Sequence, residues 1–330
     1  MIINETLDRW LGDLSAQRHT RQAMEDAAGA LARLPAVGAL ADGLAAAERE
    51  GADAVLALAR TLLDDLGVIR ACLDLLIAAA ARDPFFRPPM RAVSGEVQSG
   101  LLLFHKPALS IQLSVMGADR IAEKRFRRGD SAASIFFTGQ RSLFRFLDSG
   151  GATLSLWEAP EIDAQFIAER SGQCRLVDRR ALADGDFFEI DGRRNSFLVE
   201  HAPRDLVFVQ ATTPLGAGPV SAEYDWTTRR LVGTSGTDDA GSRIQLMLTL
   251  LRASGRVDAA PLFADLAASG PFHARWHAMR ELLGLDAEAA LPGLRAMAAG
   301  DPHPEVRAAA AETLGALFDD MQERTDPCPA

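Results

Sequence analysis

The last third of the chain repeats a helical pattern at a fixed interval. Arg243, Arg275 and Arg307 are separated by 32 positions each, and each opens a predicted helix. A second predicted helix lies between successive members of this series, with Pro261 and Pro292 nearly in register. A fixed period that carries a helix pair is typical of solenoid repeats. Because one pair cannot bury its own apolar stripe, the units must stack on each other.

The last of these units resembles a HEAT repeat. In the segment DPHPEVRAAA, Asp301 and Arg307 are six positions apart, as in that family. The resemblance implies that such residues form a ladder between neighbouring turns of the stack. Ser269 stands where the family has Asp before Arg275, so the preceding unit departs from the pattern. With only two and a half units present, we expect the domain immediately upstream to cap one side.

The central part of the chain changes to an apolar period of two. In the segment LSIQLSVM, one face carries the apolar residues Leu109, Ile111, Leu113 and Val115, and the other carries Ser110, Gln112 and Ser114. Several other short segments have the same texture and are bounded by Gly, Asp, Pro or Asn. Short strands with turn signals at this spacing predict an antiparallel sandwich or barrel.

One stretch of this region, ADGDFFEIDGRRNSFLVEHAPRDLVFVQAT, resembles the second conserved stretch of the cupin superfamily. It has a Gly-Asp opening, a strand and the dipeptide Asp191-Gly192, which is a strong hairpin signal. Asn195 occupies the position of the family's usual metal-binding His, and the family's HxH stretch has no counterpart. The resemblance therefore implies a cupin-like barrel without the family's usual metal ligands.

These patterns together predict an α+β, multidomain chain. The segment ARDPFFRPPMR contains three prolines in six residues, which ends the helical texture before it. We expect an N-terminal helical region at 1–83 and a cupin-like β domain at 84–240. HEAT-like repeats follow at 241–320, and a disordered tail at 321–330.

Composition argues against several partners. The formal net charge is −10, and the Arg-rich stretch from Arg120 to Arg145 is interrupted by acidic residues, so we interpret it as a solvated strand-and-loop surface and expect no nucleic acid. Three widely separated cysteines without a CxxC spacing indicate a reducing compartment. The apolar stretch at 68–81 is too short to cross a bilayer, and the first residues lack a signal-peptide pattern. We therefore predict a cytoplasmic protein without membrane contact.

The candidate ligand-binding residues are polar or aromatic side chains on predicted strands: Gln112, Arg141, Arg145 and Trp157. Arg145 alternates with Phe144 and Phe146, so it faces away from both rings. If its face is the barrel lumen, a buried guanidinium there needs an anionic partner. A carboxylate or phosphate ligand would serve, and so would Asp148 or Glu158.

Histidines supply two further candidate groups. His105 and His201 could hold a single divalent metal with a carboxylate or amide, although Glu200 and His201 are adjacent in a strand and should point to opposite faces. His273 and His277 lie one helical turn apart, but HARWH lacks the Glu of zinc-protease helices. With Arg280, we assign these last two histidines to a surface for a protein partner.

Our preferred interpretation is a non-catalytic ligand-binding or adaptor protein. The β domain would bind a small molecule or a peptide segment, and the helical repeats would bind a protein. One alternative is a divergent metal-dependent cupin-type oxygenase or hydrolase using His105 and His201. Another is a structural subunit of a larger complex. The sequence contains no GxGxxG, GxxxxGK[ST], GxSxG or CxxC motif, so nucleotide-fold, P-loop, serine-hydrolase and thiol-redox functions have no motif support.

Overall fold

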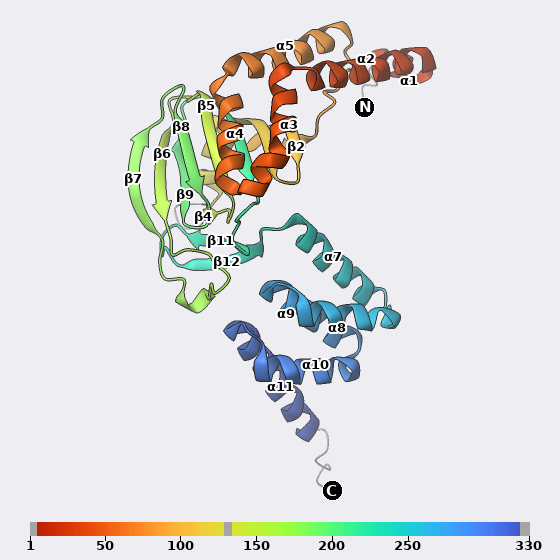
Figure 1. Cartoon of the computed structure of the whole chain (residues 1–330), viewed down its shortest axis with the longest axis vertical. Coiled ribbons are helices and arrows are strands. Elements are labelled where there is room, and N and C mark those ends of the chain that lie inside the picture. The colour runs from red at the N-terminus through yellow and green to blue at the C-terminus, as the bar shows by residue number, and fades with distance from the viewer. Residues whose placement is uncertain (1–4, 129–133, 324–330) are drawn as a thin grey trace.

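A computed structural model describes residues 5–128 and 134–323 of the chain (Figure 1). The fold is mixed α+β and multidomain, as expected. Helices come first, antiparallel sheets follow, and helices return after the last strand. In Figure 1 the N-terminal helices lie above and in front of the sheets, and the C-terminal helices extend below them.

The N-terminal region folds into a series of helices because its apolar residues recur at helical spacing. They are α1 (Glu5–Gly12), α2 (Leu14–Ala32), α3 (Pro35–Glu50), α4 (Ala52–Asp64) and α5 (Leu66–Arg82). Asp13 caps α2 by accepting hydrogen bonds from the backbone N–H groups of Ser15 and Ala16. Pro35 occupies the first position of α3, where no intrahelical N–H is required.

The central region forms three antiparallel sheets. The large sheet has the order β1-β2-β3-β10-β5-β8, and the two smaller sheets have the orders β12-β11-β4 and β7-β6-β9. The strands of the three sheets are β1 (Ala92–Ser94), β2 (Gln98–Lys106), β3 (Leu109–Met116), β4 (Ser134–Phe137), β5 (Arg141–Asp148), β6 (Thr153–Glu158), β7 (Arg175–Ala181), β8 (Phe187–Asp191), β9 (Asn195–His201), β10 (Leu206–Thr213), β11 (Val220–Asp225) and β12 (Leu231–Gly236). The large sheet faces the β7-β6-β9 sheet, because Phe146 and Phe208 share one buried cluster with Leu154 and Val199.

Helices α3 and α4 cover the outer face of the large sheet. One buried cluster joins the helix residues Leu44, Leu56 and Leu63 to the strand residues Ile111, Leu143 and Val209. The predicted apolar face of β3 therefore packs under helices, and its polar face points between the sheets. This arrangement decides which side chains line the interior of the β domain.

Two local expectations are wrong. Residues 118–128 form helix α6 (Ala118–Arg128) rather than strand and loop, with Ile121 buried against the β domain. Residues 129–133 of the same stretch lie outside the described residues. The Asp191-Gly192 turn does not close a hairpin either, since β8 pairs with β5 and β9 pairs with β6. The turn carries the chain from the large sheet to the β7-β6-β9 sheet. Backbone hydrogen bonds of Gly192 with Gly139 and Gln140 hold the turn beside β5.

The C-terminal region is a stack of helices, α7 (Asp239–Ala253), α8 (Ala260–Ser269), α9 (Phe272–Leu285), α10 (Ala287–Gly300) and α11 (Pro304–Glu323). The ladder implied by the HEAT resemblance is present between units. Arg275 on α9 donates two hydrogen bonds to the Asp301 carboxylate, at 2.8 and 2.6 Å. Arg307 closes the last unit by donating to the Asp301 carbonyl. Of the predicted tail, residues 321–323 belong to α11 and 324–330 lie outside the described residues.

The β domain contacts this stack where α9 and α11 begin. The Nε2 atom of His303 lies 3.1 Å from the carbonyl oxygen of Phe166, and its ring stacks on Phe272 with a centroid separation of 4.0 Å. The Ala168 N–H donates to the Glu305 carboxylate at 2.5 Å. The β domain therefore contacts the stack at the starts of α9 and α11, and it leaves the outer face of α7 exposed.

Among the described residues, no single helix meets the length and hydropathy needed to cross a membrane. Taken together, α2 and α3 would meet them, but the chain bends by 65° between these two helices.

Candidate functional site

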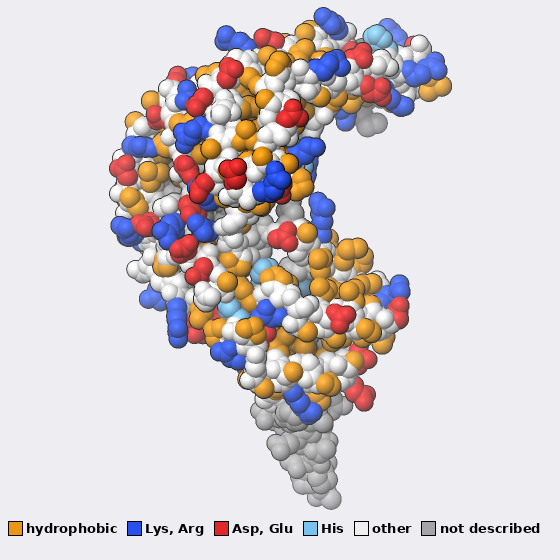
Figure 2. All heavy atoms as spheres, in the orientation of Figure 1, with side chains coloured by type: hydrophobic (Ala, Val, Ile, Leu, Met, Phe, Trp, Pro, Cys, Tyr) orange, Lys and Arg blue, Asp and Glu red, His pale blue; other side chains and the backbone are white. Residues whose placement is uncertain are grey.

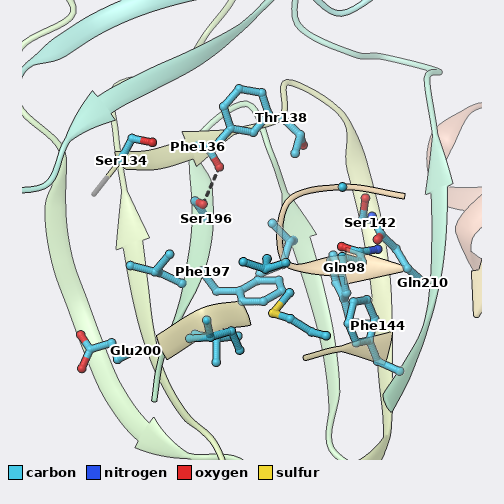
Figure 3. Close-up of a pocket in the computed structure, with 18 of the residues that line it drawn as sticks. Gln98, Ser134, Phe136, Thr138, Ser142, Phe144, Ser196, Phe197, Glu200 and Gln210 are labelled. Atoms are coloured by element: carbon cyan, nitrogen blue, oxygen red, sulfur yellow. Dashed lines mark hydrogen bonds between the residues drawn. The ribbon is translucent and has the colours of Figure 1, made fainter. Parts of the chain in front are cut away.

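A pocket of about 650 Å³ lies inside the β domain, between the large sheet and the two smaller ones. Its walls come from β2, β3, β5 and β10 on one side and from β4 and β9 on the other, with α6 at one end. Figure 3 shows Gln98, Ser142 and Gln210 gathered on one side of this pocket, across from Ser196 and Phe197. The volume falls in the range of pockets that enclose small molecules.

The large-sheet wall of the pocket carries a group of polar, uncharged side chains. Gln112 and Gln210 are opposite each other in the register of β3 and β10, and the Gln112 amide nitrogen lies 3.3 Å from the Gln210 amide oxygen. Gln98 and Gln112 both donate to the Ser114 hydroxyl, at 2.8 and 3.1 Å. The wall thus presents a connected set of amide and hydroxyl groups that hold each other in place.

Aromatic rings surround this polar wall. The lining includes Phe136, Phe144, Phe197, Phe208 and Trp226. Phe144 and Phe197 meet edge to face at 4.9 Å, which fixes both rings between the two sheets. Ser196, on the β9 side, donates to the Phe136 carbonyl at 2.6 Å and ties β9 to β4 (Figure 3).

The charged residues of the lining pair with each other or with neighbours. Lys124 on α6 lies 2.9 Å from Glu96, and Arg179 on β7 donates to Glu200 at 2.8 Å. Each charge is therefore compensated by the protein itself. A ligand in the pocket meets amides, hydroxyls and rings rather than an uncompensated charge.

Of the four predicted ligand-binding residues, the structure places only Gln112 on the pocket. Arg141 lies on the helix-covered face of β5, where it pairs with Asp53 at 2.6 Å and Glu189 at 2.7 Å. These ion pairs and hydrogen bonds raise the pKa of Arg141 against the opposing effect of burial, the largest single influence. Its guanidinium joins α4 to the large sheet.

Arg145 lies on the same outer face of β5 as Arg141. Phe144 and Phe146 face the interior, as the alternation predicts, so the guanidinium points away from the pocket. Asp148 and Glu158, the two carboxylates proposed as partners of Arg145, form ion pairs with Arg204 and Arg175 instead. Within the described part of the chain, the buried Nε atom of Arg145 has no hydrogen-bond partner.

Trp157 is buried beside the pocket rather than on it. Its ring meets Trp226, a lining residue, at a centroid separation of 5.0 Å, and its indole N–H donates to Ser155 at 2.9 Å. Trp157 therefore packs behind a residue that lines the pocket and does not line the pocket itself.

The histidines proposed as metal ligands do not face the pocket. His105 is the next-to-last residue of β2 and pairs with Ser110, His201 ends β9 and pairs with Thr153, and both side chains are exposed. In residues 5–128 and 134–323, no three or more His, Cys, Asp or Glu side chains lie together in a way that could hold a metal ion.

The histidines assigned to a partner surface make contacts within the chain. The Nε2 atom of His277 lies 3.2 Å from the Gln245 carbonyl oxygen on α7 and 3.8 Å from Glu281. His273 lies against Gly236 of β12 and is half-buried. Arg280 alone of the three is exposed.

Several lining residues were not predicted, among them Gln98, Ser142 and Gln210. A usable signal was present for Gln210, because it is the polar residue at an interior position of the apolar segment DLVFVQAT, as Gln112 is in LSIQLSVM. A single amide within an otherwise apolar strand indicates a side chain that needs a partner inside the fold.

Comparison with known proteins bears on the C-terminal helices first. The family model for HEAT repeats matches residues 246–327, which confirms the interpretation of the C-terminal helices. No curated protein matches the chain.

Solved structures similar to this chain include one whose name contains the word cupin. An RmlC-like cupin from Shewanella frigidimarina shares 8% identity, covers 38% of this chain and 84% of its own, and has a TM-score of 0.23. Ectoine synthase from P. lautus shares 9% identity over 37% of this chain and 68% of its own, also with a TM-score of 0.23. KdgF from a Halomonas species shares 14% identity over 37% and 87%, again at 0.23. At TM-scores this low, these likenesses carry no argument about fold or function.

Proposed function

We propose that this chain is a ligand-binding protein whose β domain encloses an uncharged, partly aromatic small molecule and whose helical repeats bind a protein. The observation that carries the first part is the composition of the pocket, in which the connected amides of Gln98, Gln112 and Gln210 lie among aromatic rings from both walls.

The chemistry of the lining selects the ligand class. An ionised ligand would lose its hydration on entry and would find every charged residue of the lining already paired. A neutral molecule with a flat apolar body and one polar edge loses little hydration and gains both ring contacts and amide hydrogen bonds. The lining residues with amide or hydroxyl groups orient such a ligand rather than react with it.

The protein-binding part rests on the HEAT-repeat match and on the extended helical surface that such repeats present. The cytoplasmic location expected from the cysteines stays a prediction.

Titration with Nile red, an uncharged dye with a flat ring system and a carbonyl acceptor, tests the pocket. We expect saturable binding of one dye per chain, with brighter and blue-shifted emission. The substitution Gln112→Leu removes the amide at nearly constant volume and should weaken binding about tenfold, the effect of losing about 1.4 kcal/mol of hydrogen bonding.

Gln22→Leu is the matched control, because Gln22 is an exposed residue of α2 that bonds only to Asp26 among the contacts of the described residues. This variant should bind the dye as the native chain does. Equal affinity in the Gln112→Leu and native proteins, or no saturable binding at all, would contradict the proposal.

A further inference from the structure

The first helix of the repeat stack exposes a continuous apolar stripe. On α7 the exposed fractions are 70% for Leu246, 63% for Met247 and 63% for Leu250, and Ile244 beside them is 40% exposed. Hydrophobic side chains gather over α7 and α8 in the space-filling view (Figure 2). An apolar patch of this kind on a folded protein marks a binding surface.

The repeat register shows what this stripe lacks. The positions 32 residues after Leu246, Met247 and Leu250 are occupied on α9 by Ala278, Met279 and Leu282, which are 0%, 2% and 2% exposed. In that later unit they share a buried cluster with Phe263 and Ala267 of α8, the first helix of the same unit.

Helix α7 is therefore the second helix of a unit that has no first helix before it. The chain enters α7 directly from β12, which ends at Gly236, two residues before the capping residue Asp238. Near the open position, Val257 and Leu262 beside and on α8 are also exposed, at 53% and 48%. The position missing beside α7 is that of one amphipathic helix.

The N-terminal helices carry a helix with the matching face. Leu7 and Leu11 on α1 and Leu14 at the start of α2 are 40%, 57% and 71% exposed. Leu7 and Leu11 are one turn apart on α1, at the i and i+4 positions by which an amphipathic helix fills an apolar groove, and Leu14 follows across the break between α1 and α2. In Figure 1, α1 and α7 both extend toward the same side of the molecule.

From this complementarity we infer that α1 of one copy of the chain packs on α7 of a second copy, reciprocally, in a two-fold dimer. The inference names the partner of the helical repeats and so rests on their proposed protein-binding role, but it is independent of the pocket. The first helix that each stack lacks is supplied by the other copy.

Charge agrees with this occupant. If α1 runs antiparallel to α7, the Asp13 carboxylate approaches Arg243 at the start of the stripe. Each copy contributes both of its patches to a two-fold contact.

Light scattering coupled to size exclusion tests the dimer. We expect twice the chain mass for the native protein. Leu246→Glu combined with Leu250→Glu on α7 should give a monomer, and so should Leu7→Glu combined with Leu11→Glu on α1. Val177→Glu is the control, because Val177 is an exposed apolar residue on β7, away from both patches, and this variant should stay dimeric.

Cysteine trapping identifies the pairing. In a Cys328→Ser background, where Cys72 and Cys174 are buried, oxidation of mixed Leu7→Cys and Leu250→Cys chains should give a cross-linked dimer that neither chain gives alone. A monomeric native protein, a dimer that survives the α1 substitutions, or cross-linking of Leu250→Cys chains to each other would overturn the inference. Nile red titration of the α7 variant separates this outcome from a failure of the pocket, since its pocket is intact.

Discussion

At the scale of single residues, His273 makes the junction between the sheets and the repeats sensitive to pH. Burial lowers the pKa of His273, with a smaller opposing effect of Asp238 and a further lowering by Arg275. Its Nδ1 atom is buried and has no hydrogen-bond partner within the described ranges. Protonation in place would therefore leave a charge without compensation.

The lowered pKa of His273 decides how stability depends on pH. Below about pH 6.5 the unfolded chain binds a proton at this histidine more readily than the folded chain does. Stability should therefore fall as the pH drops through this value. We expect His273→Asn to flatten the decline, measured as the midpoint of urea unfolding at a series of pH values. An unchanged slope would assign the decline to other groups.

Asp301 is the residue on which the repeat ladder depends. Its side chain is 5% exposed and that of Arg275 is 11% exposed. Burial opposes ionisation, but the hydrogen bonds from Arg275 and from the His303 backbone hold the pKa of Asp301 below its usual value. The stability that this carboxylate contributes is present above about pH 4 and is lost as the pH falls further.

We expect Asp301→Asn to destabilise the chain by about 3 kcal/mol, because it leaves the Arg275 guanidinium buried without its counterion. Asp258→Asn is the comparison, since Asp258 and Arg256 form a pair of which both members are more than half exposed, and its loss should cost under about 1 kcal/mol. Equal midpoints for the two variants in urea unfolding would refute the difference in burial as the cause.

At the scale of elements, the turn after β8 decides how the sheets join. A Cβ atom added at Gly192 would lie 2.2 Å from the Thr138 hydroxyl and 2.4 Å from the Gln140 carbonyl oxygen. We expect Gly192→Ala to destabilise the β domain by about 2 kcal/mol, because backbone must move to admit the methyl group. Gly233→Ala on β12, where the added atom meets nothing within 4 Å, is the control for thermal unfolding.

At the scale of the whole molecule, the N-terminal helices and the large sheet share one core. Leu63 of α4 is fully buried in the cluster that contains Leu143 and Val209. We therefore expect Leu63→Ala to lower stability by about 3 kcal/mol and to shift the loss of helix and sheet signals together. Circular dichroism and tryptophan fluorescence should report one shifted transition. A β-domain transition that stays in place would show two independent units.

The arrangement of the molecule also explains which predictions could be made. Helical and strand periods and the 32-residue repeat are patterns along the chain, so they could be predicted from the spacing of residues, and the resemblance to HEAT repeats implied the Asp301 ladder. The burial of Arg141 under α4 and the inward direction of Gln112 depend on contacts with distant segments, Asp53 and Gln210, which no periodicity reveals.

The sequence by itself determined the order of helices, sheets and helical repeats along the chain, because the change between helical and strand periods depends on short-range spacing of apolar residues. Only the tertiary structure decided which face of the large sheet became the interior. A strand with one polar and one apolar face can turn either side inward, and α3 and α4 covered the apolar side with their leucines. That choice placed the glutamines in the pocket and both candidate arginines outside it.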